Sequence, residues 1–480
     1  MLVNGEKPMT ALAELYAPSV TAKLWSVAQE ALRLSTGPPT LFPEYTHPGG
    51  GKYIYRDLEF WTSGFFPGSL YLLLERQIRH PHVLQQQGQQ PPPLHRLQLE
   101  HACTWWTENL HANAHLATTH DIGFMTMPWA RPAWELRHDA RALATLTAAA
   151  ATLQARFSPA AGAIRSWDSC ATGDYSFQDP AREFLVVIDN MMNLALLFYV
   201  AAQTGDGAMR DVAICHARTT RRTHVRADGT TLHLAVLDPG DGAVRRRLTH
   251  QGRHHGSCWS RGQAWAVAGF AEAWGWTRGE EFLDTAVLCA DAFLGRMPEG
   301  DGAVPPWDFE PASAVDGDGD GALGRERGAG EKKKKEEPTD TSAAMIASYG
   351  FLLIYEALRL RNSARAQKYL DAALRITNAV CKGYLTPRAK FVPQANEATV
   401  RTVADTADHG AEEQDVAVVR FDVDDGGCQA ILDGATINNY EFAPRRWANH
   451  SLVYADYYFM LVGNKLLDMG IGHAFGSLGG

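Results

Sequence analysis

One acidic side chain begins a long apolar segment at residues 187–198, VIDNMMNLALLF. The segment is too long and too rich in Met, Leu and Ala for a strand, and it is apolar all round, which is typical of a buried helix. An ionised carboxylate at that position, Asp189, is costly unless it is hydrogen-bonded or its pKa shifts. An N-cap is the ordinary explanation of a lone Asp at a helix start. A catalytic acid is the other explanation, and the rest of the chain must decide between them.

The chain repeats this arrangement in pairs of segments. Amphipathic helices are predicted near residues 18–34, 94–109, 139–156, 206–222, 280–297 and 364–380. Segments that are apolar all round predict buried helices near 60–76 and 121–130, and from about 189, 259, 340 and 450. Six helical hairpins that close into a ring form an (α/α)₆ barrel, so we predict an all-α fold in one catalytic domain over residues 1–480. Because the buried helices all start on one side, their first residues should converge on one end of the barrel.

Two segments interrupt the pattern. Residues 312–339 are polar, rich in Gly and segregated in charge, which predicts a disordered insertion. Residues 396–430 are weakly periodic and predict a surface insertion, in which the β-branched run at 416–421 is typical of a short hairpin strand.

Composition and charge bear on partners and location. The 480 residues carry a net charge of −9, which repels nucleic acid and anionic membranes, so we expect neither as a partner. The N-terminal residues lack a basic stretch followed by an apolar one, and no apolar run approaches the roughly 20 residues that span a bilayer. The seven cysteines are scattered singly, which is typical of a reducing compartment. We expect a cytoplasmic monomer or homodimer.

Metal and nucleotide motifs are weak. The run Asp316, Asp318 and Asp320 resembles the first half of a calcium loop, but Arg327 stands where the bidentate Glu is required. A histidine and cysteine cluster near residues 250–258 is interrupted by glycines and lacks a Cys-x-x-Cys partner. The sequence contains neither a Gly-x-x-x-x-Gly-Lys loop nor a Gly-x-Ser-x-Gly elbow with triad partners. We therefore expect no metal and no cofactor, and we exclude phosphoryl transfer and serine hydrolysis.

A pair of carboxylates remains. Asp121 and Asp189 are both predicted at starts of buried helices on the same end of the barrel. Neighbouring connections add side chains that suit an anionic sugar, because Arg can grip a carboxylate, Trp can cover a sugar face, and His and Gln can bind hydroxyls. These side chains are His120, Trp167, His233, Gln251, Arg261 and Trp265. Each has an ordinary structural explanation when taken alone, so their joint placement carries the argument.

The motifs around these residues resemble one known family. Residues 120–124 (HDIGF), 189–194 (DNMMNL), 259–265 (WSRGQAW) and 306–309 (PWDF) are similar to segments of the unsaturated glucuronyl hydrolases, glycoside hydrolase family 88. The similarity continues through 340–344 (DTSAA) and 453–458 (VYADYY), so it covers nearly the whole chain apart from the two insertions.

The resemblance implies a fold, a reaction and a site. It implies an (α/α)₆ barrel that removes the unsaturated (4,5-dehydro) uronic acid from the non-reducing end of lyase-generated oligosaccharides. It implies that Asp189 protonates C4 of the C4=C5 enol ether and assists addition of water at C5, while Asp121 assists. The same carboxyl can thus act as acid and then as base. The implied substrate contacts are His120, Trp167, His233, Gln251, Arg261 and Trp265.

The chain departs from the family pattern at two places. Phe66 stands where many relatives carry Trp, and we expect it to keep a stacking face for the substrate. The loop at residues 444–450 also differs, which leaves the preference for sulfated or unsulfated substrate open. Two alternatives stay open as well, an unsaturated rhamnogalacturonyl hydrolase acting on pectin fragments and a catalytically silent sugar-binding barrel.

The pKa of Asp189 is a further expectation. The negative charge of Asp121 should raise it and a helix N-terminus should lower it. Catalysis by Asp189 as an acid requires burial and the charge of Asp121 to dominate.

Overall fold

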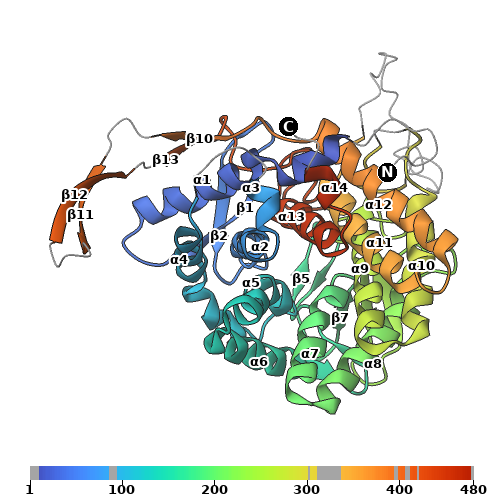
Figure 1. Cartoon of the computed structure of the whole chain (residues 1–480). Coiled ribbons are helices and arrows are strands. Elements are labelled where there is room, and N and C mark those ends of the chain that lie inside the picture. Colours follow the sequence, from blue (N-terminus) through green and yellow to red (C-terminus); the bar gives the residue numbers. More distant parts are fainter. Residues whose placement is uncertain are drawn as a thin grey trace, which may run out of the picture.

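Twelve long helices form two concentric rings in the computed structural model (Figure 1). The structure describes residues 10–85, 94–300, 303–310, 337–393, 398–405, 411–418 and 421–476. The helices of the inner ring are α2 (Phe65–Arg79), α5 (Ile122–Arg137), α7 (Asn190–Thr204), α9 (Ser260–Thr277), α11 (Thr341–Leu358) and α13 (Val453–Asp468). Each packs against the next, and α13 closes the ring on α2. The predicted (α/α)₆ barrel is confirmed.

The outer ring alternates with the inner one along the chain. Its helices are α1 (Pro18–Leu34), α4 (Arg96–Thr107), α6 (Ala140–Gln154), α8 (Gly207–His224), α10 (Glu280–Leu294) and α12 (Ser363–Gly383). Short helical turns lie beside them, namely η1 (Thr10–Tyr16), α3 (Pro81–Gln85), η2 (Asn109–His115) and α14 (His473–Gly476). The outer helices are amphipathic and bury one face, whereas the inner helices are enclosed on nearly every side, as the two hydrophobic patterns predict.

Small residues let the inner helices pack closely. A Cβ at Gly350 of α11 would stand 2.9 Å from the backbone nitrogen of Ala268 on α9. Among the described residues, α11 is also the helix long and apolar enough to cross a membrane by length and composition, but 78% of that stretch is buried inside the barrel.

The strands lie in the loops. An antiparallel sheet of β7 (Phe184–Val187), β8 (Leu234–Leu237) and β9 (Val244–Leu248) leads directly into α7. The hairpin of β1 (Leu41–Thr46) and β2 (Tyr53–Asp57) precedes α2, and Tyr45 bridges to Leu452 at the start of α13. Two-residue strands complete the loop that precedes β7, namely β3 (Phe157–Ser158), β4 (Ala163–Ile164), β5 (Cys170–Ala171) and β6 (Ser176–Phe177).

The two interruptions of the helical pattern differ. Residues 312–336 of the first lie outside the described residues. The second contains a hairpin of β11 (Ala398–Asp405) and β12 (Ala411–Val418), which lies away from the rings in Figure 1, and a pair of β10 (Lys390–Pro393) and β13 (Phe421–Asp424). Its last residues belong to the barrel instead, because Cys428 and Gln429 are buried and the Cys428 carbonyl accepts a hydrogen bond from Lys23 of α1.

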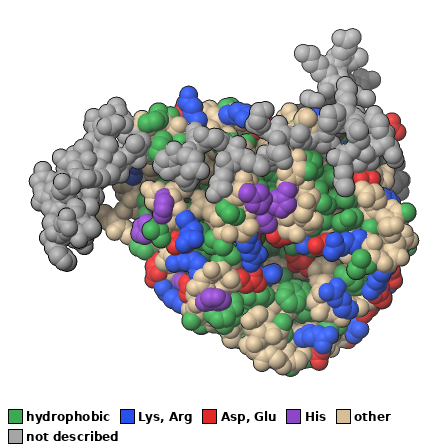
Figure 2. All heavy atoms as spheres, in the orientation of Figure 1, with side chains coloured by type: hydrophobic (Ala, Val, Ile, Leu, Met, Phe, Trp, Pro, Cys, Tyr) green, Lys and Arg blue, Asp and Glu red, His purple; other side chains and the backbone are tan. Residues whose placement is uncertain are grey.

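Charges of both signs are interspersed over the described part of the face drawn in Figure 2.

Candidate active site

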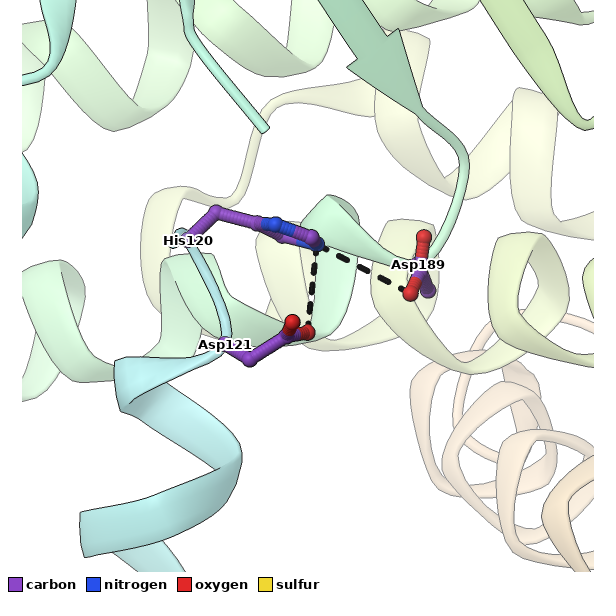
Figure 3. A group of neighbouring side chains, drawn as sticks. All are labelled: His120, Asp121 and Asp189. Atoms are coloured by element: carbon purple, nitrogen blue, oxygen red, sulfur yellow. Dashed lines mark ion pairs between the residues drawn. The ribbon is translucent and has the colours of Figure 1, made fainter. Parts of the chain in front are cut away.

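Two carboxylates and one imidazole meet where two inner helices begin (Figure 3). Nε2 of His120 lies 3.3 Å from Oδ1 of Asp121 and 3.7 Å from Oδ2 of Asp189. The His120 side chain is fully buried, whereas the side chains of Asp121 and Asp189 are 11% and 17% exposed. The expected convergence of the helix starts therefore brings the two acids to one site that solvent still reaches.

Neither acid caps its helix. Asp121 occupies the N-cap position of α5 and Asp189 that of α7, yet neither side chain accepts a hydrogen bond from the first turn. Instead, Thr119 donates to Oδ2 of Asp121 at 2.8 Å, and Oδ1 of Asp189 is buried without a hydrogen-bond partner among the described residues. The structure thus argues against the N-cap explanation of both acids.

His120 is fixed by Ser166, which lies in the loop between β4 and β5. The Ser166 carbonyl accepts hydrogen bonds from the backbone nitrogen of His120 at 3.1 Å and from Nδ1 at 3.0 Å. With Nδ1 carrying a proton, Nε2 is the nitrogen that can accept or release one toward the acids.

The three groups perturb one another's pKa values. Burial alone would lower the pKa of His120, but the charges of Asp121 and Asp189 outweigh it and raise the pKa. Burial raises the pKa of Asp121, with Asp189 acting in the same direction and His120 opposing. Burial would also raise the pKa of Asp189, but the adjacent His120 lowers it. The pKa of each group therefore depends on the charge of the other two.

One expectation is therefore corrected. We expected burial and the charge of Asp121 to compete with the helix terminus over the pKa of Asp189. Burial does act to raise it, but the hydrogen bond and charge of His120, assisted by His233, outweigh burial and the net shift is downward. The sequence places His120 next to Asp121, and only the fold places it next to Asp189.

Three predicted contact residues line the same region. His233 precedes β8 and its carbonyl accepts from the Ile188 nitrogen at 3.0 Å, which sets it beside Asp189. Its Nδ1 accepts from the backbone of His250, and burial lowers its pKa to about 3, so it stays neutral at pH 7. The half-buried Trp167 ring lies 6.3 Å from both the His120 and the His233 ring centroids. The two rings therefore lie beside the paired acids, and their contact with a substrate stays a prediction.

Arg261 is engaged with the protein rather than free to grip a ligand. Its Nη1 donates to Oδ2 of Asp340 and to the Thr436 carbonyl, both at 2.7 Å, and to Ser342 Oγ at 3.2 Å. Its Nη2 donates to Gln251 Oε1 at 2.7 Å and to the Ile437 carbonyl at 2.6 Å. The Arg261 side chain is 2% exposed, so its fork fastens the loop before α13 to the barrel, and the Gln251 side chain is used in the same way.

The two remaining predicted contacts are buried. Trp265 packs between Phe124 and Tyr458 in the barrel interior. Phe66 packs against Trp106 of α4, with ring centroids 4.6 Å apart. The prediction that Phe66 offers a stacking face to substrate is wrong, because one step of about 100° along the helix turns Phe66 toward the outer ring while Phe65 faces the interior.

Three residues near the two acids were not predicted as part of the site from the sequence. Trp61 is a partly exposed aromatic residue just before α2, with its ring centroid 5.6 Å from that of Phe124. His250, which we had considered only for zinc, lies with its ring 5.3 Å from Trp167. Asn193 joins the helices of the two acids. No periodic signal distinguishes such residues from core positions.

Among the described residues, His120, Asp121 and Asp189 are also the group whose ligand atoms, all within 4.8 Å of one another, are close enough to share a metal ion. A proton on the His120 ring, lying between the two carboxylates, explains the same short distances without a metal ion.

The relatives of the chain, together with its (α/α)₆ barrel and paired carboxylates, define the class of the protein, which is a glycoside hydrolase. No family model matches the chain. It is 32% identical over 350 residues to the unsaturated glucuronyl hydrolase of Bacillus sp. (strain GL1), covering 72% of this chain and 79% of that protein. The chain belongs to the unsaturated glucuronyl hydrolase family.

Two further comparisons agree. The crystal structure of unsaturated glucuronyl hydrolase from Bacillus sp. GL1, described as responsible for the degradation of glycosaminoglycan, superposes with a TM-score of 0.69 at 26% identity, covering 95% of this chain and 98% of that one. The unsaturated chondroitin disaccharide hydrolase of Streptococcus agalactiae serotype III is 28% identical over 66% of this chain and 68% of its own length.

Proposed function

We propose that the protein removes the unsaturated (4,5-dehydro) uronic acid from the non-reducing end of lyase-generated oligosaccharides by acid-assisted hydration of the C4=C5 double bond. The observation that carries the proposal is the His120 imidazole held between the carboxylates of Asp121 and Asp189, with one Asp189 oxygen unpartnered. Relatives named for unsaturated glucuronyl and unsaturated chondroitin disaccharide substrates support the same class of substrate.

The proposed reaction adds one water molecule. A proton from Asp189 adds to C4, and the oxygen of water forms a bond to C5, while the deprotonated carboxylate takes the proton that this water releases. The product is a hemiketal at C5. Its C5–O5 bond then breaks, C5 becomes a ketone, and the resulting hemiacetal at C1 expels the remaining sugar as an alcohol.

His120 supplies the proton in this scheme. The lowered pKa of Asp189 favours its ionised form in the free protein, and the raised pKa of His120 favours the protonated form of the neighbouring ring. Because Nε2 faces Oδ2 of Asp189, the ring can protonate that carboxyl as the double bond is attacked, while Oδ1 is the oxygen without a protein partner. One carboxyl then serves as acid and base, so the two-carboxylate separation rule of ordinary glycosidases does not apply.

The test is the ultraviolet absorbance of the conjugated double bond. We expect absorbance to fall when the protein is added to unsaturated disaccharides, and Asp189→Asn to lose roughly 10²–10⁴ in rate while staying folded. Unchanged absorbance across unsaturated chondroitin, hyaluronan, heparin, gellan and xanthan products would exclude the proposal. Turnover of the unsaturated rhamnogalacturonyl disaccharide alone would select the pectin alternative, and calorimetric binding without product would select the silent barrel.

We also propose that the protein works in the cytoplasm. All seven cysteines are free, which supports a reducing compartment. Fractionation of the source cell with an antibody to the protein tests this.

A further inference from the structure

A buried asparagine joins the two helices that carry the acids. Asn193 lies on the first turn of α7, four residues after Asp189, and its side chain is fully buried. Its Oδ1 accepts a hydrogen bond from the backbone nitrogen of Phe124, on the first turn of α5, at 2.9 Å. Its Nδ2 lies 3.5 Å from the Asp189 carbonyl, to which it donates.

The Asn193 side chain accepts from the Phe124 backbone N–H, which would otherwise need the Asp121 carboxylate as its acceptor. The first backbone nitrogens of a helix have no partner within the helix, and the N-cap side chain ordinarily accepts from the second or third of them. Asp121 is the N-cap of α5 and Phe124 the third residue after it, so an Asp at this position would be expected to cap that nitrogen. Asn193 of the neighbouring helix does so instead.

Glycine at position 123 allows Asn193 to cap α5 in place of Asp121. A Cβ at Gly123 would stand 2.5 Å from Oδ1 and 2.9 Å from Cα of Asn193. The contact with the Asn193 backbone means that the two helix starts could not approach this closely with a larger residue there. The short distance between the helices is what lets an amide from α7 reach the first turn of α5.

We infer that Asn193 is a positioning residue, which caps α5 in place of Asp121 and so leaves the Asp121 carboxylate free to lie beside His120, opposite Asp189. The consequence for the reaction rests on the function proposed above; the geometric consequence does not. Without Asn193, the Asp121 carboxylate gains the unsatisfied Phe124 nitrogen as a partner and turns away from His120.

The charged and titratable groups around His120 define the readout. They are Asp121, Asp189, the buried His216, and Arg156, which donates to the same Ser166 carbonyl as His120 and whose charge acts on Asp121. If Asp121 turns to cap α5, His120 loses one of the two negative charges beside it. A role confined to holding two helices together would lower stability without changing the titration of His120.

The experiment measures Asn193→Ala in the full chain by kinetics and by NMR titration of the His120 ring. We expect kcat on an unsaturated disaccharide to fall by about 10- to 100-fold, since a displacement near 1 Å in a catalytic site can cost about 10²-fold. We expect the His120 titration midpoint to move down toward its ordinary value. In the Asp121→Asn background, Asn193→Ala should cost little further rate, because both changes act through the same carboxylate.

Asn464→Ala is the matched control. Asn464 is also buried and also joins two inner helices, since it lies on α13 and its Nδ2 donates to the Leu72 carbonyl of α2 at 2.9 Å, but it lies near the other end of the barrel. This variant should lose stability and keep both the pH profile and the His120 midpoint of the unchanged protein.

Several results would overturn the inference. A folded Asn193→Ala protein with an unchanged His120 midpoint would do so, as would rate losses that add fully to those of Asp121→Asn. If Asn193→Ala does not fold, Gly123→Ala pushes both the amide and the backbone of Asn193 away from the first turn of α5 without removing a polar group, and a folded Gly123→Ala protein with an unchanged midpoint would be equally decisive. The NMR result stands even if the unchanged protein hydrolyses no substrate, so failure of the proposed function remains distinguishable.

Discussion

Replacement of Arg261 by Met separates a structural role from a substrate-binding one. The sequence predicts that the guanidinium binds a substrate carboxylate. In the structure it donates instead to Asp340, Ser342 and Gln251 and to two backbone carbonyls. A Met side chain is nearly as long as that of Arg but donates no hydrogen bond. The substitution therefore removes these bonds and still fills much of the space that the Arg261 side chain occupies.

The expected magnitude follows from what the substitution leaves behind. Asp340 is completely buried, and loss of its cation leaves a carboxylate in the interior. Breaking a buried ion pair by removing one partner costs about 3–5 kcal/mol. Asp340 retains hydrogen bonds from the Ser342 nitrogen and hydroxyl, and burial already raises its pKa despite the opposing charge of Arg261, so protonation limits the cost. We therefore expect Arg261→Met to lower the free energy of unfolding by about 3–5 kcal/mol.

The assay is urea unfolding at pH 7, followed by circular dichroism, on Arg261→Met, Asp340→Asn and the double variant. The double variant should cost less than the sum of the two single changes, because each removes the partner of the other. A loss below about 0.5 kcal/mol in Arg261→Met, the range of ordinary surface substitutions, together with a large rise in KM, would refute the structural role and restore Arg261 as a substrate ligand.

Three further predictions concern stability and binding. Burial lowers the pKa of His216 from 6.5 to about 3, so as pH falls below 6.5 the unfolded chain binds the proton first and stability is lost; His216→Gln should lose about 2 kcal/mol less between pH 7 and pH 5 in urea unfolding, and equal losses would contradict this. Gly350→Ala should cost about 1–3 kcal/mol by overpacking against Ala268, whereas Gly275→Ala on α9, with no atom within 4 Å of the added Cβ, should cost nothing; equal effects in thermal unfolding would refute the packing argument. Trp167→Ala should raise KM for unsaturated disaccharides by about 5- to 30-fold through loss of about 1–2 kcal/mol of ring contact, measured by initial rates, and an unchanged KM would remove Trp167 from the site.

The hydrophobic pattern was sufficient for the architecture. The predicted start of the helix after Asp189 and of the helix after Trp259 each lie within one residue of α7 and α9. Helices bury a fixed face at a fixed period, so local sequence determines where they begin and which side packs inward. The buried end of the second interruption, at Cys428 and Gln429, escaped prediction because its contacts to Lys23 and Tyr53 join residues distant in sequence.

The sequence by itself determined the two acids and the ring of helices that brings them to one end, because both follow from the order and period of apolar residues. Only the tertiary structure decided what surrounds those acids. Phe65 and Phe66 are equally apolar, yet only packing shows which faces the interior. The neighbour of Asp189 that dominates its pKa, His120, comes from another hairpin, as does Phe124, the partner that Asn193 caps. Electrostatic and hydrogen-bonded contacts depend on distances between elements, and periodicity carries no information about those distances.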